Sequence, residues 1–158
     1  MRLFVKTTLP KKPKTKESEQ IAYAYAVLLV IIALCQLFTF DEFIFLVGDF
    51  GLPGGDPIAR LMSGVVVVSE IFALPFLLNM KLSPLMRIVS MSFSWLVPLI
   101  WFVLSLWLML TINAVSNIGF LGTIVNITPG WWTIFFCLAL GIMASWSSWG
   151  MWPSERRK

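Results

Sequence analysis

Four long apolar stretches alternate with short polar segments along the chain. They cover residues 21–40, 61–80, 88–112 and 131–152, and Glu70 is the only charged residue inside them. A helix of about 20 apolar residues crosses a hydrocarbon core roughly 30 Å thick. Within lipid, only helices satisfy every backbone polar group over such lengths. The pattern therefore predicts an all-α integral membrane protein, a bundle of four transmembrane helices.

The composition supports this prediction and narrows the chemistry. Hydrophobic residues make up 58% of the 158 residues, charged residues 13%, and the mean hydropathy is +0.85. A soluble domain is about a quarter charged. The chain has no histidine and two cysteines, so the usual proton-transfer side chain and a four-cysteine zinc site are both excluded. We expect no metal site, and an accessory protein is favoured over an enzyme.

Basic residues gather on one side of the predicted membrane domain, residues 21–152. Eleven of the twelve lysines and arginines lie in the tails, 1–20 and 153–158, or in the turn 81–87, and Arg60 is the exception. The positive-inside rule places such segments in the cytoplasm. We therefore expect a plasma (inner) membrane protein with both termini cytoplasmic and with outer loops at 41–60 and 113–130.

The basic N-terminal tail admits two other interpretations. A signal peptide has an apolar region of about 7 to 15 residues that ends at a small-residue cleavage site. The stretch 21–40 is longer and has no such site, so we expect it to remain as a helix. The tail also lacks the interleaved aromatic residues and the folded platform with which proteins bind nucleic acid. We expect it to be disordered or to lie along the anionic inner leaflet, with no nucleic-acid partner.

The first outer loop and the ends of the last helix carry further patterns. Residues 43–47 and Phe50 are apolar but too few to span, and glycines and prolines follow them. This predicts a short interfacial or re-entrant segment that caps the outer mouth of the bundle.

Tryptophans at both ends of the fourth stretch are typical of interface anchors: Trp131, Trp132, Trp149 and Trp152.

Small and polar residues recur at helical spacing on three of the predicted helices, so each set lies on one face. Small residues let membrane helices approach closely, and hydroxyl groups add hydrogen bonds between helices. We expect these faces to point inward, with a polar translocation path as the alternative. The sets are Ala22, Ala26, Ala33 and Gln36 on the first helix, Ser90, Ser94, Pro98, Trp101 and Ser105 on the third, and Cys137, Gly141, Ser145 and Ser148 on the fourth.

Glu70 is the first candidate for a functional residue. It lies in the middle of the second apolar stretch, near the expected bilayer midplane, and no lysine or arginine shares that depth. Burial without a cation favours the neutral acid, and an acid in the membrane is a functional hypothesis by default. The alternative is a structural acid that hydrogen-bonds Gln36 or a serine of the third helix. Pro75 follows on the same helix and can kink it or free a backbone carbonyl.

The two cysteines are the second candidate. Cys35 and Cys137 form no C-x-x-C motif, which disfavours a self-contained thiol oxidase. Both lie near the outer ends of their predicted helices, so they share a depth at which a redox-active disulfide could form. The alternative is that both are small apolar residues of the core, the commoner role of buried cysteine.

One stretch of the chain resembles a known family. An outer segment (FDEFIFLVGDFGLP) leads into a helix with a central acid (ARLMSGVVVVSEIFALPFLLNM), and a basic turn follows (KLSPLMRIVS). This stretch, 41–97, is similar to the DoxX and MauE group of four-helix inner-membrane proteins. The resemblance implies a subunit that serves a redox partner at the outer face, in quinone-linked sulfur oxidation or in disulfide formation. It implies Glu70 as a site residue and a quinone as a possible cofactor.

Two other functions stay open from the sequence. Small multidrug-resistance proteins also have four helices and one glutamate in the membrane, which suggests a small proton-coupled transporter that uses Glu70. Those chains are shorter and carry the acid in the first helix. The third possibility is a structural subunit of a larger membrane complex. The bilayer itself, a redox enzyme and further copies of this chain are the expected partners.

Overall fold

The computed structural model describes residues 13–111 and 115–151, which hold five α-helices and no strand. The helices are α1 (Lys16–Phe38), α2 (Phe40–Gly48), α3 (Gly55–Leu77), α4 (Pro84–Leu110) and α5 (Trp131–Met151). Four of them, all except α2, are long and apolar enough to cross a membrane. The prediction of an all-helical chain with four candidate spans is therefore confirmed, and the orientation across the bilayer stays a prediction.

Three of the long helices, α1, α3 and α4, begin earlier than the apolar stretches do, whereas α5 begins with its stretch at Trp131. α1 begins at Lys16 because the Thr15 side chain accepts a hydrogen bond from the backbone N–H of Ser18. α4 begins at Pro84 because Ser83 caps it in the same way, through the N–H of Met86. Side-chain caps of this kind fix where a helix starts, whereas hydropathy marks only the part at hydrocarbon level. The first turns of α1 and α4 contain charged residues, so the predicted bounds missed them.

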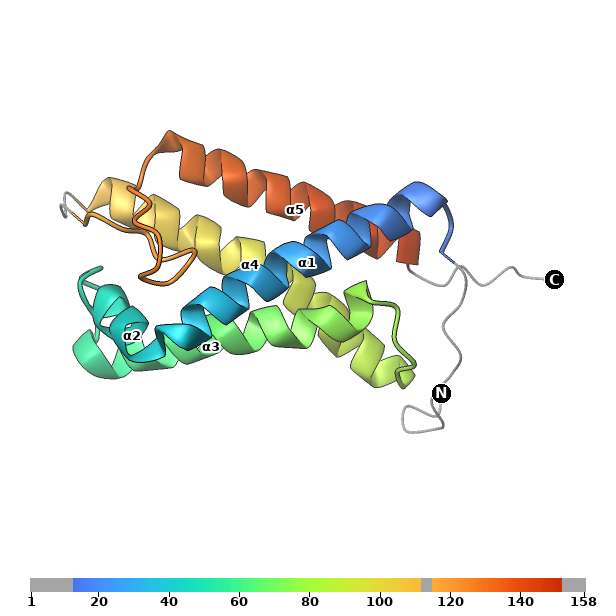
Figure 1. Ribbon diagram of the computed structural model, residues 1–158, viewed down its shortest axis with the longest axis horizontal. Coiled ribbons are helices and arrows are strands. Elements are labelled where there is room, and N and C mark those ends of the chain that lie inside the picture. Colours follow the sequence, from blue (N-terminus) through green and yellow to red (C-terminus); the bar gives the residue numbers. More distant parts are fainter. Residues whose placement is uncertain (1–12, 112–114, 152–158) are drawn as a thin grey trace.

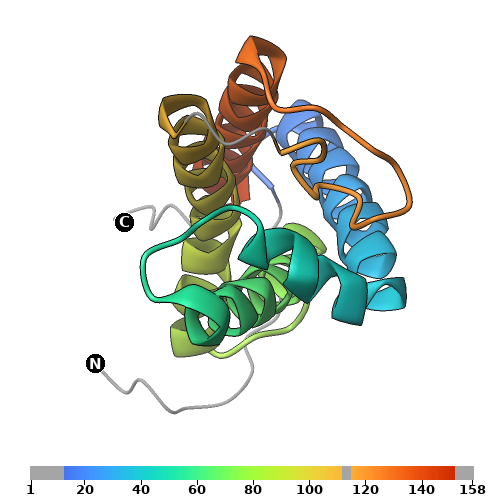
Figure 2. The ribbon, with the colours of Figure 1, turned by 90° about the vertical axis from the view of Figure 1, so that its left-hand side faces the viewer.

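The four long helices form one bundle around a shared core (Figure 1; Figure 2). α3 packs against α4, α4 against α5, α5 against α1, and α1 against α3. α1 begins and α5 ends at the same end of the bundle, where the backbone N–H of Lys14 donates to the carbonyl oxygen of Gly150 over 3.0 Å. The α3–α4 turn lies at this end too. We call it the basic end, because Lys14, Lys16, Lys81 and Arg87 lie there.

The opposite end, which we call the acidic end, is closed by α2 and by the loop 115–130 (Figure 1). α2 is the short segment expected in the first outer loop, and it buries Phe43 and Val47 against the bundle. The Trp107 indole N–H on α4 donates to the carbonyl oxygen of Phe50 over 3.0 Å. This bond ties the chain after α2 to α4. Asp41, Glu42, Asp49, Asp56 and Arg60 lie at this end. The described lysines lie at the basic end as expected, although Glu17 and Glu19 of α1 lie there too.

The inward faces of α1 and α4 match the predicted stripes. Every member of the first set, from Ala22 to Gln36, is buried, and so is every member of the second, from Ser90 to Ser105. The stripe predicted for the last helix is correct only in part. Cys137 is buried, Gly141 and Ser148 are half-buried, and Ser145 is exposed, whereas Leu140, Ala144 and Ser147 are buried. The buried face of α5 is set by its contacts with α1 and α4, which residue size alone does not reveal.

Candidate functional site

Glu70 on α3 is fully buried, with 0% of its surface exposed. At 1.5 Å per residue it lies roughly 10 Å from Leu77 and roughly 22 Å from Gly55 along the helix axis, so it is remote from both helix ends. The helix presents it to the centre of the bundle together with Val66, Val67 and Ala73, which are also buried. The acid therefore stands in an apolar interior, as predicted.

Two side chains donate hydrogen bonds to the same oxygen of this acid. The Gln36 amide nitrogen on α1 lies 3.4 Å from Glu70 Oε1, and the Trp101 indole nitrogen on α4 lies 3.2 Å from it. The Gln36 nitrogen also donates to the carbonyl oxygen of Phe120, over 3.1 Å. This polar cluster (Glu70, Gln36, Trp101 and the Phe120 carbonyl) joins α1, α3, α4 and the loop 115–130.

Two oxygens of the cluster, Glu70 Oε2 and Gln36 Oε1, have no hydrogen-bond partner. Both are acceptors if Glu70 is ionised, so neither can serve the other. A single proton on Glu70 Oε2 turns that oxygen into a donor and leaves the amide oxygen as the matching acceptor. Buried polar groups are almost always paired. A protonated Glu70 can donate from Oε2 to Gln36 Oε1, so both oxygens would then have a partner. This fits the neutral acid expected from the sequence.

The predicted partners of Glu70 are correct in one case and wrong in the other. Gln36 is a partner, but the serines of α4 are not. Ser94 and Ser105 donate to the carbonyl oxygens of Met91 and Trp101 on their own helix. A serine in a helix readily bonds a carbonyl one turn back. Trp101 was on the predicted stripe and could have been recognised as a donor, whereas nothing in the sequence pointed to Phe120.

An apolar groove of about 410 Å³ lies beside the polar cluster, between α1, α5 and the loop 115–130. Phe120 is common to both features. Its ring packs on Trp101, with ring centroids 4.5 Å apart, and on Phe136 at 5.1 Å. Phe120 therefore separates the groove from Glu70. The groove is lined by Ala24, Val27, Leu28, Ile31, Ile32, Phe120, Leu121, Ile127, Trp132 and Phe136.

The loop that carries Phe120 is held by one asparagine. Asn117 is buried, donates to the carbonyl oxygen of Gly122, and accepts from the backbone N–H groups of Gly119 and Ile127. The Ile118 N–H donates to the carbonyl oxygen of Ile127 over 2.8 Å. These bonds close the loop on itself and fix Phe120 over Trp101.

The two cysteines are free thiols. Cys137 is buried, and its sulfur lies 3.7 Å from the Ser105 hydroxyl of α4, whereas Cys35 is half-buried on α1. The structure therefore does not join them, and Cys137 behaves as a small residue of the core. Within the described residues no group of histidine, cysteine and acidic side chains is arranged to hold a metal ion.

Comparison with family models, with curated proteins and with solved structures gives no match for this chain. The DoxX/MauE resemblance therefore stays a prediction, and the site geometry is the basis for a functional proposal.

Proposed function

We propose that this chain is an accessory membrane subunit of DoxX/MauE type, which binds a lipid-soluble molecule such as a quinone for a redox partner at the outer face. One observation carries the proposal: Phe120 lines the apolar groove and also belongs, through its carbonyl oxygen, to the polar cluster around the buried acid. An apolar ligand with a hydrogen-bonding headgroup needs apolar walls and a few polar groups nearby.

Access to the groove supports a ligand that arrives through the bilayer. Val27 and Ile31 on α1 and Trp132 on α5 line the groove and are exposed on the surface that would face lipid. A lipid-soluble molecule would therefore reach the groove sideways, without crossing water. A ligand in contact with Phe120 would be linked to Glu70 through Gln36, whose amide nitrogen donates hydrogen bonds to both residues.

The acidic end offers a surface for a partner protein. The Thr123 hydroxyl donates to Glu42 of α2, and the Thr123 backbone N–H donates to the Thr39 hydroxyl over 3.2 Å. The loop and α2 are thereby joined into one surface directly above the groove. A partner bound there would lie close to the ligand, which is what an accessory redox subunit requires.

The experiment is to purify the protein gently and to identify bound lipids and quinones by mass spectrometry. Ala24→Trp fills the groove and should remove the bound molecule. Val103→Trp is the control, because Val103 is exposed on α4 and does not line the groove. The proposal fails if no lipid-soluble redox molecule is bound, or if both variants retain it equally.

A further inference from the structure

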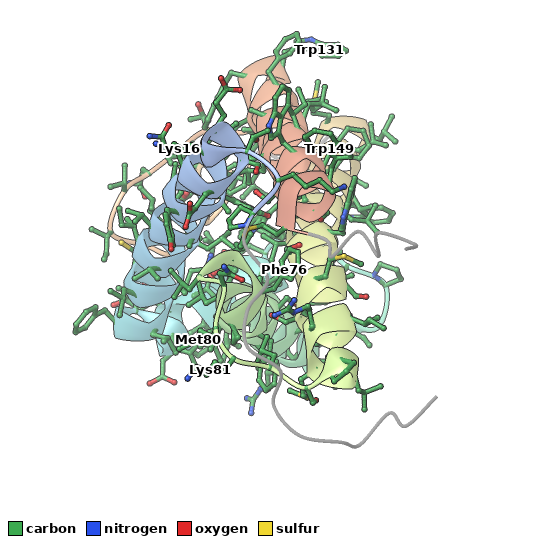
Figure 3. The ribbon with its side chains drawn as sticks, turned by 90° about the vertical axis from the view of Figure 1, so that its right-hand side faces the viewer. Lys16, Phe76, Met80, Lys81, Trp131 and Trp149 are labelled. Carbon is green, nitrogen blue, oxygen red and sulfur yellow. The ribbon has the colours of Figure 1, made fainter. Side chains whose placement is uncertain are left out.

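Arg87 is an unusual residue at the basic end of the bundle. It belongs to the first turn of α4, yet only 9% of its surface is exposed. It lines a small hollow with Phe76, Asn79, Met80, Leu82 and Met151, between the end of α3 and the end of α5. Figure 3 looks onto this end, with Phe76 towards its centre and Met80 and Lys81 on the turn.

The guanidinium of Arg87 has a nitrogen, Nη2, that is buried and has no hydrogen-bond partner. Guanidinium is charged at all accessible pH values and can only donate hydrogen bonds. A buried charge without a partner is strongly unfavourable, so such groups in proteins are paired. We therefore expect an anionic hydrogen-bond acceptor to pair with the Arg87 guanidinium.

The nearest helix end does not supply one. α3 ends in a capping motif in which Asn79 adopts a left-handed conformation, with φ of 51°. The carbonyl oxygens of Leu74, Pro75 and Phe76 already accept from the backbone N–H groups of Leu78, Met80 and Asn79, over 2.8 to 3.0 Å. The end of α3 is thus capped by its own backbone and does not depend on Arg87.

The surroundings of Arg87 are positive. Lys14, Lys16 and Lys81 lie at the same end of the bundle and, together with Arg87, outnumber Glu17 and Glu19 in the first turn of α1. The N-terminus of α4 adds the positive end of its helix dipole. Arg87 lies within about 5 Å of the start of α4 along the axis. If α4 spans a bilayer, this is the depth of lipid headgroups rather than of acyl chains.

We propose that Arg87 binds the phosphate group of an anionic phospholipid at the basic end of the bundle. A guanidinium donates two parallel hydrogen bonds to phosphate, which a lysine cannot do. The hollow has no room for a lipid or for a phosphate group, so the Arg87 guanidinium turns outward to the mouth of the hollow and presents Nη2 to the phosphate oxygens there, while the rest of the lipid stays outside. The nearby lysines favour a headgroup with net negative charge.

The test uses the full chain in detergent, with thermal unfolding and native mass spectrometry as readouts. Phosphatidylglycerol should bind and raise the unfolding temperature, and phosphatidylcholine should do so less. Arg87→Gln should weaken phosphatidylglycerol binding about tenfold or more, whereas Arg60→Gln, at the opposite end, should not. Arg87→Lys keeps the charge without the paired donors and should bind with intermediate affinity. It serves as the second variant if Arg87→Gln does not fold.

Separate arms identify the source of the anion. Inorganic phosphate that protects the wild type as well as phosphatidylglycerol does would support the phosphate site and assign it to a soluble compound. Equal binding of phosphatidylglycerol by the wild type and Arg87→Gln would overturn the proposal. It would also be overturned if Glu155→Gln, in the C-terminal tail, reproduced Arg87→Gln while neither phosphate source affected the wild type. The partner would then be a carboxylate of the chain itself.

Discussion

The hydroxyl oxygen of Ser90 on α4 accepts a hydrogen bond from the backbone N–H of Phe76 on α3, over 2.9 Å. The same hydroxyl donates to the carbonyl oxygen of Phe72, over 2.6 Å. In a regular helix these two backbone groups would bond each other. Pro75 lies between them in the sequence, and its ring crowds the preceding turn of the helix. Ser90 thus adds hydrogen bonds from a neighbouring helix to the turn that contains the proline.

Ser90→Ala should destabilise the bundle by about 1–3 kcal/mol, because the backbone groups of Phe72 and Phe76 lose the hydroxyl that joins them. The measurement is unfolding of the purified protein in mixed micelles, followed by circular dichroism. Ser92→Ala is the matched control. Ser92 is exposed and bonds only the Ile88 carbonyl oxygen of its own helix, so its loss should leave stability unchanged. Equal stability of the two variants would contradict this account of α3.

Glu70→Gln should be nearly as stable as the wild type, because an amide reproduces the neutral acid: its N–H₂ group can donate to Gln36 and its oxygen can accept from Trp101. Glu70→Ala should lose about 1–3 kcal/mol, since it leaves the buried indole N–H of Trp101 without its acceptor and leaves Gln36 with the Phe120 carbonyl as its remaining acceptor. Chemical unfolding of the two variants in parallel measures this difference. A large loss in Glu70→Gln would mean that the cluster needs a charge.

Infrared difference spectroscopy tests the protonation state of Glu70 directly. At neutral pH, subtraction of the Glu70→Gln spectrum from that of the wild type should reveal a protonated C=O band. Glu17→Gln, at an exposed position of α1, should reveal none. A carboxylate band for Glu70 would refute the neutral acid. Proton flux into proteoliposomes that disappears in Glu70→Gln would instead favour the proton-coupled transporter.

Gly122→Ala should loosen the loop 115–130. Gly122 has φ of +59°, and a Cβ atom there would lie 2.4 Å from the Thr39 hydroxyl and 2.9 Å from the backbone oxygen of Cys35. The loop must therefore move away from α1 and carry Phe120 with it. Limited proteolysis should cut this loop faster than in the wild type. Gly64→Ala on α3 meets no atom within 4 Å and should leave the cleavage rate unchanged.

The distribution of lysine and arginine along the sequence predicts that both termini are cytoplasmic. A C-terminal fusion to a protein that fluoresces only in the cytoplasm should be bright, and a fusion to an enzyme active only in the periplasm should be inactive. Fusions made after Gly54, in the first outer loop, should give the reverse pattern. A bright reporter at both positions would show that the first predicted span does not cross the membrane.

The sequence by itself determined the helices and the inward faces of two of them. Runs of apolar residues of spanning length leave a helix as the only way to satisfy the backbone. On α1 and α4 the small and polar residues coincide with the buried face, because they are where neighbouring helices approach most closely. Glu70 was identified for a related reason: a single acid in an apolar helix is costly unless it is enclosed and paired.

Only the tertiary structure decided what surrounds that acid. Trp101, Gln36 and Phe120 lie on three different segments. The sequence pointed to Gln36 as a partner of Glu70, but it carried no signal that Trp101 and the Phe120 carbonyl would complete the cluster. The loop 115–130 has no hydrophobic period, because Asn117 rather than a repeating apolar face holds it. The inward face of α5 was also decided by packing, since it depends on which sides α1 and α4 present. Helix formation depends on residues close in sequence, whereas a site depends on distances between residues far apart in it.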